Sequence, residues 1–416
     1  MARVKREFFS VRTVAEAQRD FRPDRRTATE TVPLEAGLDR VAAEAIASPG
    51  DLPGFARAAV DGYAVRAADT FGASTSVPLQ LRLIAEIEMG AASSASVGPG
   101  EAATIPTGGA LPAGADAVVM VERTNPAGAE SVEILETVAP GEAVVRADED
   151  VPRGTRLIAA GFPLRPEHLG LLAAAGVTSF AAFARPQVTI LSTGDELVSP
   201  STATLAPGQI RDATASALAA HVLSAGGKPT FGGIVADDAA ALRSALEVAL
   251  SSSDLVVVSA GSSVGARDVT AEVVDSLGPP GIWCHGLALK PGKPTLLAEC
   301  DGVPLLGLPG NPASALVVFR LLGVGLVRMI GGHREPQAVA TTSAVLARDV
   351  PSAPGRLDVV QVTLTENGAE PLFAKSSALS ALARADGQIL VSEEVGGLYA
   401  GSEVVVELYS PMPAHG

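Results

Sequence analysis

The feature that constrains the fold most is the regular alternation of apolar runs and helical segments between residues 186 and 331. Two runs rich in β-branched residues, QVTILST and LVVVSAG, are typical of parallel strands that are buried on both faces. Helical segments lie around them, namely DATASALAAHVLSAGG, DDAAALRSALEVALSSS and DVTAEVVDSLG. A further run, VPLLGLPG, ends where we expect a helix to begin near Pro312. This order predicts a doubly wound α/β domain.

The segments on either side of this domain have other patterns. Residues 11–47 carry apolar residues at three- and four-residue steps, which predicts helix, and LRPEHLGLLAAAGV (164–177) predicts a helix with Pro166 in its first turn. From about residue 51 to 150, short β-like runs alternate with Gly/Pro turns, as in a small all-β unit. Towards the C-terminus, runs such as RLDVVQVTLTE and SEVVVELYS predict another β-domain.

A chain of 416 residues is long enough for about two to four domains. We expect a multi-domain fold of the α/β plus β class, with a central doubly wound α/β domain, a β-rich inserted domain and a C-terminal β-barrel-like domain. The expected boundaries are 1–50 and 151–184 for a helical linker domain (domain I), 51–150 for the β-rich domain (domain II), 185–331 for the α/β domain (domain III) and 332–416 for the C-terminal β-domain (domain IV).

Composition excludes several classes of protein. The net charge of −15 argues against non-specific binding of nucleic acid, because phosphates would be repelled. Two cysteines, Cys284 and Cys300, without a CxxC motif or a Cys/His cluster, argue against a structural zinc site and a disulfide framework. The N-terminus has no apolar signal-peptide core, and Arg320 and Arg328 interrupt the longest apolar segment, which predicts a core helix and no membrane span. We therefore expect a soluble cytoplasmic protein.

Three loops rich in Gly, Ser and Thr directly follow predicted strands: STGDELV, SAGSSVGARD and LPGNPAS. Because ligands of open parallel sheets bind outside the carboxyl ends of the strands, we expect all three loops at one edge, where backbone N–H groups can bind phosphate. Asp195, Glu196 and Asp268 follow in these loops, and oxygen ligands beside phosphates suit Mg²⁺. Each loop alone is also consistent with a plain tight connection.

The segment LALKPGKPT places Lys290 and Lys293 around a Pro-Gly turn, in a chain with five lysines and 26 arginines. Both ammonium groups could bind one polyanion, although a hairpin-like turn with solvated lysines is also consistent with the pattern. The PGNP turn that follows is typical of a helix start, with Asn311 as N-cap and Pro312 as the first residue. Since a helix start is also an anion site, the two interpretations are compatible.

Other polar residues stand in turns. Asp61 lies in a Val-Asp-Gly-Tyr turn and Thr107 precedes two glycines, and both are also consistent with ordinary structural turns. Asp237 and Asp238 precede a predicted helix, where we expect one of them to be only an N-cap. The five histidines are scattered along the sequence, which argues against histidine-based catalysis or metal binding.

Seven motifs occur in order over about 260 residues: AVDGYAV, PTGGALPAGADAVVMVE, ILSTGDELV, GQIRD, SAGSSVGARD, LKPGKP and GLPGNPAS. Together they resemble the MoeA/gephyrin E-domain family of molybdenum insertases (molybdopterin molybdotransferases), over nearly the whole chain. The resemblance implies an elongated four-domain homodimer with its active site at the subunit interface. It also implies that adenylated molybdopterin and molybdate are the substrates, that AMP is released with the help of Mg²⁺, and that the chain contacts a molybdopterin adenylyltransferase.

The resemblance also implies roles for individual residues. The implied catalytic residues are Asp61, Thr107, Glu196, Asp237 and Asp268, and Glu196 and Asp268 are also the implied metal ligands. The implied substrate-binding residues are Ser192, Thr193, Gly194, Ser259, Gly261, Ser262, Ser263, Lys290, Lys293, Pro309, Asn311 and Pro312. No covalent nucleophile is implied, because the thiolates of the substrate take the metal.

The chain departs from the family pattern in three places. Ala260 stands where many relatives have glycine, Gly286 where relatives often have a basic residue, and AVVRADED (143–150) where they have an Asn-x-Arg…Gly-Glu-Asp stretch, which weakens a role for Arg146 and Asp150. Two alternative functions stay open at this point. One is a molybdopterin adenylyltransferase-like enzyme, and the other is a non-catalytic dimeric binding or scaffold protein of the same fold.

Overall fold

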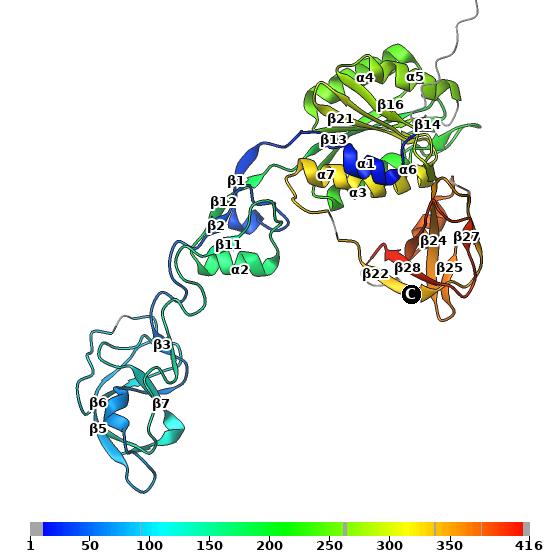
Figure 1. Ribbon diagram of the computed structural model, residues 1–416. Coiled ribbons are helices and arrows are strands. Elements are labelled where there is room, and N and C mark those ends of the chain that lie inside the picture. The colour runs from blue at the N-terminus through cyan, green and yellow to red at the C-terminus, as the bar shows by residue number, and fades with distance from the viewer. Residues whose placement is uncertain (1–10, 92, 261–263, 337, 376, 411–416) are drawn as a thin grey trace, which may run out of the picture.

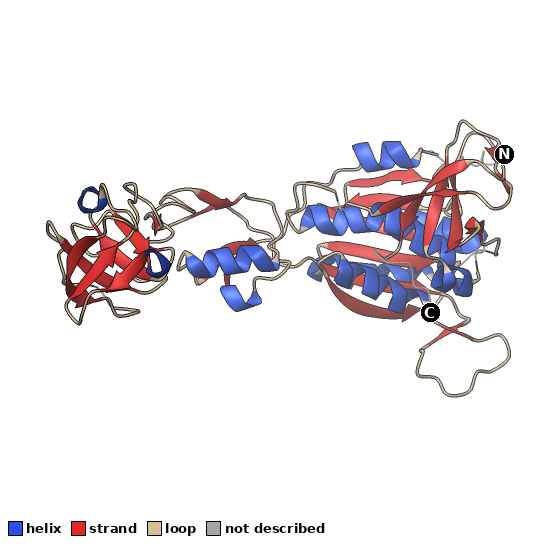
Figure 2. Ribbon diagram, turned by 90° about the horizontal axis from the view of Figure 1, so that it is seen from below, coloured by secondary structure: helices blue, strands red, loops and turns tan. Residues whose placement is uncertain are grey.

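The structure, a computed structural model, describes residues 11–91, 93–260, 264–336, 338–375 and 377–410, and only the backbone of 264–268. The chain is elongated, with a β-rich domain at one end, a linker region in the middle, and the α/β and C-terminal β-domains together at the other end (Figure 1, Figure 2). This arrangement confirms the predicted class of an α/β domain combined with β-rich domains. The exact domain boundaries stay predictions.

The α/β domain contains a six-stranded sheet in the order β16-β13-β17-β21-β20-β18. The strands are β13 (Gln187–Thr193), β16 (Lys228–Val235), β17 (Leu255–Ala260), β18 (Pro280–His285), β20 (Leu296–Cys300) and β21 (Val303–Pro309). The first four in the sheet order are parallel, as predicted, and β20 and β18 extend the sheet antiparallel. Strands β18 and β20 were not predicted, because they are short and lie on either side of the Pro/Gly-rich lysine turn.

Two hydrophobic cores lie on opposite faces of this sheet. Successive residues of a strand point to opposite faces, so Leu255 and Val257 belong to one core and Val256 and Val258 to the other. The first core packs against α1, α3 and the helical stretch after β21, and the second against α4 and α5 (Figure 1). The helices are α1 (Val14–Asp20), α3 (Thr214–Ser224), α4 (Ala239–Ser252) and α5 (Val264–Asp275). Helices on both faces confirm the doubly wound prediction.

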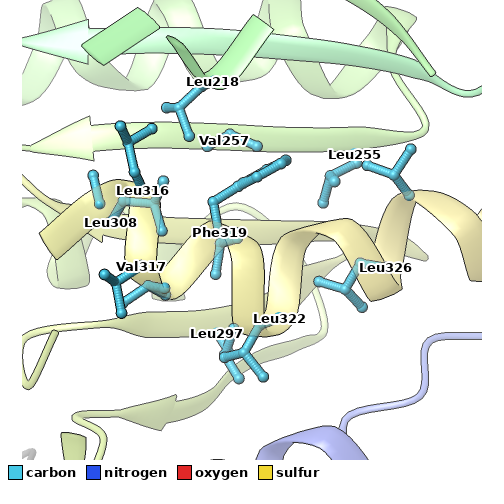
Figure 3. Packing of buried hydrophobic residues seen from close by; sticks show 14 of the residues in the cluster. Leu218, Leu255, Val257, Leu297, Leu308, Leu316, Val317, Phe319, Leu322 and Leu326 are labelled. Carbon is cyan, nitrogen blue, oxygen red and sulfur yellow. The ribbon is translucent and has the colours of Figure 1, made fainter. Parts of the chain in front are cut away.

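An apolar helical stretch from Pro312 to Ile330 lies at the centre of the first core. Its parts are α6 (Pro312–Val318), a π-helical turn (Phe319–Gly323) and α7 (Val324–Ile330). Among the described residues it is the one helix long and apolar enough to cross a membrane, but 67% of its most apolar window is buried inside the protein. Phe319 is fully buried and points towards β17, near Leu255 and Val257 (Figure 3). The prediction of a core helix is confirmed.

The predicted helix over residues 11–47 is wrong beyond Asp20. Helix α1 begins after Thr13, which forms a capping box with Glu16, and it packs against the α/β domain through Val14 and Ala17. The chain then becomes mainly extended, and Asp39 has a φ of 59°, which a helix does not allow. Pairing with distant strands overrides the local helical pattern here.

The linker region is consequently built mainly from paired strands. The pairs are β1 (Thr29–Pro33) with β12 (Ser179–Phe183) and β2 (Ile46–Ala47) with β11 (Arg156–Ile158), beside a short 3₁₀ turn η1 (Leu34–Ala36) and helix α2 (Pro166–Ala174). Helix α2 confirms the prediction, with Pro166 in its first turn. Leu164, Leu172 and Phe180 form the small core of this region.

The β-rich domain at the far end has a sheet in the order β7-β4-β6-β5-β9-β8. Its strands are β4 (Gly62–Val65), β5 (Leu79–Glu86), β6 (Glu101–Ile105), β7 (Ala117–Met120), β8 (Thr124–Pro126) and β9 (Ser131–Ile134). Strand β4 lies between β6 and β7 and pairs antiparallel with both. The short strands between Gly/Pro turns confirm the sequence prediction.

The C-terminal β-domain has a sheet in the order β19-β24-β26-β28-β22, with β25 paired to β24. The strands are β22 (Thr341–Val345), β24 (Leu357–Thr365), β25 (Gly368–Pro371), β26 (Gly387–Val391) and β28 (Glu403–Leu408). Strand β19 (Leu289–Lys290) comes from the lysine turn of the α/β domain and pairs in parallel with Leu357 and Asp358 of β24. The lysine turn is therefore part of the joint between these two domains, which the sequence did not predict.

Candidate active site

The three Gly- and Ser-rich loops emerge at one edge of the α/β sheet. Strands β13, β17 and β21 are parallel neighbours, and they end at Thr193, Ala260 and Pro309. The prediction that their loops share an edge is confirmed. Gly261, Ser262 and Ser263 of the second loop lie outside the described residues, as does the side chain of Asp268 in α5.

The first loop turns sharply at Gly194, which has a φ of 149°. A Cβ at this position would lie 2.7 Å from Oε2 of Glu196, so only glycine allows the Glu196 carboxylate to fold back over the loop. Leu197 N donates to Gly194 O at 3.1 Å and Ile210 N donates to Glu196 O at 2.8 Å, which fixes the backbone around this carboxylate. The loop therefore holds Glu196 at the end of β13.

A group of carboxylates gathers beside this loop. Asp237 N donates to Oδ1 of Asp195 at 3.2 Å, which joins the loop after β16 to the loop after β13. Partial desolvation, and then the negative charges of Asp195 and Glu196, raise the pKa of Asp237. Asp238 accepts from Ala240 N and Ala241 N and is the N-cap of α4, which confirms that one of the two acids has this structural role.

The hydroxyl of Ser192 makes a hydrogen bond inside the α/β domain. Ser192 is 1% exposed, and its hydroxyl donates to Oδ2 of Asp212 at 2.6 Å. Oδ1 of Asp212 accepts from Ala215 N at 3.0 Å, so this buried carboxylate joins the end of β13 to the start of α3. Asp212 belongs to the GQIRD motif, and the sequence did not indicate this role. Thr193 and Ser259 are also buried, so substrate contacts of these three residues stay predictions.

Lys290 and Lys293 lie in the connection between the antiparallel strands β18 and β20. Both side chains are exposed, as the solvated-turn interpretation expects, but they also line a cleft of about 750 Å³. One wall of the cleft is the lysine turn with Pro309 and Asn311, and the other wall comes from β24 and the segment around Lys375 in the C-terminal β-domain. Ligand pockets of proteins have volumes in this range.

The charge of the cleft is opposite to that of the chain. Its lining has four cations, from Lys290, Lys293, Arg356 and Lys375, and one carboxylate, from Asp358. Three of the five lysines of the chain thus line one cleft, although the net charge of the chain is −15. The arrangement favours a ligand with more than one negative charge.

The PGNP turn contributes two of its residues to this cleft, Pro309 and Asn311. Asn311 occupies the N-cap position of α6, but its side chain makes no capping hydrogen bond. Pro312 is the first residue of α6 and is not among the residues that line the cleft. The helix-start interpretation is therefore confirmed for Pro312, and the Asn311 amide is available to a ligand.

Asp61 and Thr107 lie together in the β-rich domain. Asp61 precedes β4, Thr107 follows the neighbouring strand β6, and Oδ1 of Asp61 accepts from Thr107 N at 2.7 Å and from Thr107 Oγ1 at 2.9 Å. These two hydrogen bonds, the backbone one first, lower the pKa of the Asp61 carboxyl. Within one chain, the β-rich domain that contains this pair and the two domains that line the cleft lie at opposite ends of the molecule (Figure 1).

Comparison with known proteins covers nearly the whole chain. Three family models match: the MoeA N-terminal region (domain I and II) at residues 12–176, a probable molybdopterin binding domain at 189–329, and the MoeA C-terminal region (domain IV) at 343–409. Molybdopterin molybdenumtransferase 2 of Mycobacterium tuberculosis H37Rv is 35% identical over 402 residues, 95% of this chain and 97% of the relative.

The chain belongs to the MoeA family. Molybdopterin molybdenumtransferase of Bacillus subtilis is 32% identical over 388 residues, 91% of this MoeA-family chain and 90% of the relative. Two solved structures of molybdopterin biosynthesis MoeA proteins from Pyrococcus horikoshii superpose with TM-scores of 0.86 and 0.82, at 37% and 30% identity, each covering 96% of this chain and all of the solved chain. The resemblance inferred from the motifs is confirmed.

Three residues of the cleft were missed by sequence reasoning on this MoeA-family chain: Arg356, Asp358 and Lys375. One signal was present. Asp358 stands in the apolar run RLDVVQV, and a carboxylate in a buried strand needs a charged partner. Arg356, two residues earlier, is one such partner, but the other, Lys290, is 68 residues away, and no local pattern predicts it.

A metal site was predicted at Glu196 and Asp268. Among the side chains that the structure describes, no three His, Cys, Asp or Glu residues are placed to hold a metal ion. Since the side chain of Asp268 is not described, the predicted site is untested and stays a prediction. Asp195, Glu196 and Asp237 are the carboxylates that do lie near one another.

Proposed function

We propose that this chain is a molybdenum insertase, which takes adenylated molybdopterin and molybdate, forms molybdenum cofactor and releases AMP. The observation that carries the proposal is the basic cleft between the α/β and C-terminal β-domains, beside the carboxyl end of β21. Membership of the MoeA family supports it, because curated relatives that align over nearly the whole chain are molybdopterin molybdenumtransferases.

The cleft is suited to molybdate. A tetrahedral dianion needs positive charge and hydrogen-bond donors from several directions, and the guanidinium of Arg356 with the ammonium groups of Lys290 and Lys293 can supply both. The apolar part of the lining, including Leu289, Val317 and Leu382, provides space for an organic ligand beside the anion. This combination supports a pterin and an oxyanion in adjacent positions.

Mg²⁺ would be held by Glu196 and Asp268, the two ligands that the family pattern implies. Partial desolvation, and then the negative charges of Asp195 and Glu196, raise the pKa of the nearby Asp237, and a divalent cation at Glu196 would relieve part of that repulsion. When bound, Mg²⁺ would neutralise charge on the phosphates of the adenylated substrate. The residues of the chain orient the substrate, and Glu196 is held over the loop by the turn at Gly194.

We propose further that the active site is completed in a homodimer. Asp61 and Thr107 form a hydrogen-bonded polar pair in the β-rich domain, and this domain lies at the other end of the molecule from the α/β and C-terminal β-domains. A second copy of the chain would bring its own Asp61 to the cleft of the first. The ionised carboxylate of Asp61 would then act at the metal-receiving dithiolene or on a water molecule near it.

The direct test is to incubate the purified protein with adenylated molybdopterin, MgCl₂ and molybdate, and to measure AMP and active cofactor. We expect AMP release that depends on molybdate. Protein that binds adenylated molybdopterin but releases no AMP would overturn the insertase and favour a scaffold. Formation of adenylated molybdopterin from ATP and molybdopterin would instead favour an adenylyltransferase.

A further inference from the structure

Asp358 is a buried carboxylate with two cationic partners on the wall of the cleft. It is 2% exposed. Its Oδ1 accepts from Nε of Arg356 at 2.8 Å, and its Oδ2 accepts from Nζ of Lys290 at 3.3 Å and from NH2 of Arg356 at 3.5 Å. One carboxylate thus contacts the two cations that face each other across the joint between the α/β and C-terminal β-domains.

The backbone places these groups opposite one another. Lys290 of β19 pairs with Asp358 of β24 in parallel register, and Leu357 N donates to Ala288 O at 2.9 Å. This short pairing, which we call the β19–β24 seam, joins two domains that are otherwise separate sheets. The carboxylate therefore marks the position where the chain of the α/β domain meets the chain of the C-terminal β-domain.

The exposure of the three side chains shows which of them can meet a ligand. The side chain of Lys290 is 57% exposed and that of Arg356 is 38% exposed, whereas that of Asp358 is 3% exposed. A ligand in the cleft therefore meets mainly the two cations, although the largely buried Asp358 also belongs to the lining. Without Asp358, two like charges would face each other with no fixed geometry, and each flexible side chain would lose conformational entropy on binding an anion.

We propose that Asp358 is a positioning residue for the oxyanion: it holds Lys290 and Arg356, from two different domains, at a spacing that lets both bind the same anion. The proposal rests on the proposed function for the identity of that anion, molybdate. The proposal is nevertheless separate from that function, because it assigns part of the affinity of the cleft to a buried carboxylate that acts through two cations.

The test compares Asp358→Asn with a matched control, Asp386→Asn. Asp386 is also a buried carboxylate of the C-terminal β-domain, 9% exposed, and it accepts from Leu364 N at 2.7 Å, away from the cleft lining. Binding of molybdate alone to the purified protein is measured by isothermal titration, and KM for molybdate and kcat are measured in the AMP-release assay. We expect Asp358→Asn to weaken molybdate binding and raise KM by about tenfold, with kcat at saturating molybdate within about twofold.

A second comparison separates positioning from stability. In a Lys290→Met/Arg356→Met background, Asp358→Asn should leave molybdate affinity unchanged, because the carboxylate acts only through those two cations. If Asp358→Asn alone folds poorly, Asp358→Glu, which keeps the charge but moves it by one methylene, should still weaken binding more than Asp386→Glu does.

Two results would overturn the proposal. One is an Asp358→Asn protein that binds molybdate as tightly as the Asp386→Asn control, and the other is an equal loss of affinity in the Met/Met background. Either result leaves the insertase function standing if AMP is released by the unchanged protein. Conversely, absence of AMP release would remove the insertase, while the titration with molybdate alone would still decide the role of Asp358.

Discussion

Thr107 donates both its backbone N–H, at 2.7 Å, and its hydroxyl, at 2.9 Å, to the same oxygen of Asp61. The two residues are 46 positions apart in sequence and meet because they occupy adjacent ends of β4 and β6. The second carboxylate oxygen of Asp61 makes no hydrogen bond within the described part of the chain. Thr107 therefore orients the carboxylate and leaves one oxygen for a partner.

Replacing Thr107 should change the acidity of Asp61. In Thr107→Ala the hydroxyl bond is lost and the backbone bond remains, so the pKa of Asp61 should rise part of the way to its ordinary value. A lowered pKa means that the ionised Asp61 stabilises the folded protein above its ordinary pKa, and that this contribution is lost as the pH falls through the lowered pKa. The Thr107→Ala variant should therefore lose less unfolding free energy on acidification than the unchanged protein. A carboxyl-carbon NMR titration measures the shift, and Thr107→Ser, which keeps the hydroxyl, should leave it unchanged.

Removing the Asp61 carboxylate should affect activity far more than stability. The side chain is exposed, so Asp61→Ala should keep the melting temperature within about 2 °C while insertion falls at least about a hundredfold. Asp61→Asn keeps a hydrogen-bond acceptor for Thr107 but loses the negative charge. Because we assign the activity to that charge, Asp61→Asn should be as inactive as Asp61→Ala. A large fall in melting temperature for either variant would contradict the assignment to an exposed site.

A mixing experiment tests whether two chains share each site. Asp61→Ala and Lys290→Ala should each be inactive alone, yet one of the two sites in a mixed dimer would combine an intact Asp61 with an intact Lys290. Random mixing makes about half of the dimers mixed, so about a quarter of the original activity should return. The assay is AMP release after the two variants are exchanged at equal concentration, and no recovery in dimers shown to be mixed would exclude a shared site.

Gly62 should tolerate no side chain. A Cβ at this position would lie 2.0 Å from the carbonyl oxygen of Val119 on β7, and the backbone of the sheet cannot move away cheaply. Gly62→Ala should therefore cost roughly 3 kcal/mol or more of unfolding free energy. The control is Gly170→Ala in α2, where nothing lies within 4 Å and alanine should instead stabilise by about 0.5–1 kcal/mol. Denaturant unfolding measures both.

The stability of the α/β domain should depend on pH through His221 and His333. Burial, and then the charges of Arg320 and Arg328 respectively, lower the pKa of each imidazole from 6.5 to about 4. Between these values the unfolded chain binds a proton that the folded chain does not, so stability is full above pH 6.5 and falls as pH decreases towards 4.

The double variant His221→Gln/His333→Gln should reduce this dependence of stability on pH. Each histidine lowers the unfolding free energy by on the order of 2 kcal/mol at pH 4. Unfolding in denaturant at pH 4.5 and pH 7.5 measures this effect. An unchanged slope in the double variant would mean that other groups cause the acid loss.

The sequence predicted the α/β domain well because its information is local. A buried parallel strand such as LVVVSAG needs apolar residues at every position, and its loops contain the glycines that tight turns require. The prediction of helix for residues 29–47 was wrong, because their structure depends on pairing with strands more than a hundred residues later in the sequence. Such pairing leaves no periodic signal in the sequence.

The candidate site divides in the same way. The sequence motifs predicted Glu196, Lys290 and Asp61 as site residues, because each residue lies in a turn of unusual composition. Arg356 and Asp358 were missed, since they belong to a strand whose pattern only indicates a β-domain, and their importance comes from the lysine turn that the fold places against them. Contacts across domains are determined by packing and cannot be derived from spacing along one segment.

The β19–β24 seam has a consequence for how the product leaves. An anion bound by Lys290 on one side and Arg356 on the other is itself a bridge between two domains, so its binding energy also holds them in place. If the oxyanion becomes part of a neutralised metal complex, as proposed, that bridge is lost, while the pairing of two residues, the Asp358 contacts and the packing of Val359 into the α/β core remain. On the proposed function, turnover should therefore weaken one of the contacts between the two domains when the cofactor is passed on.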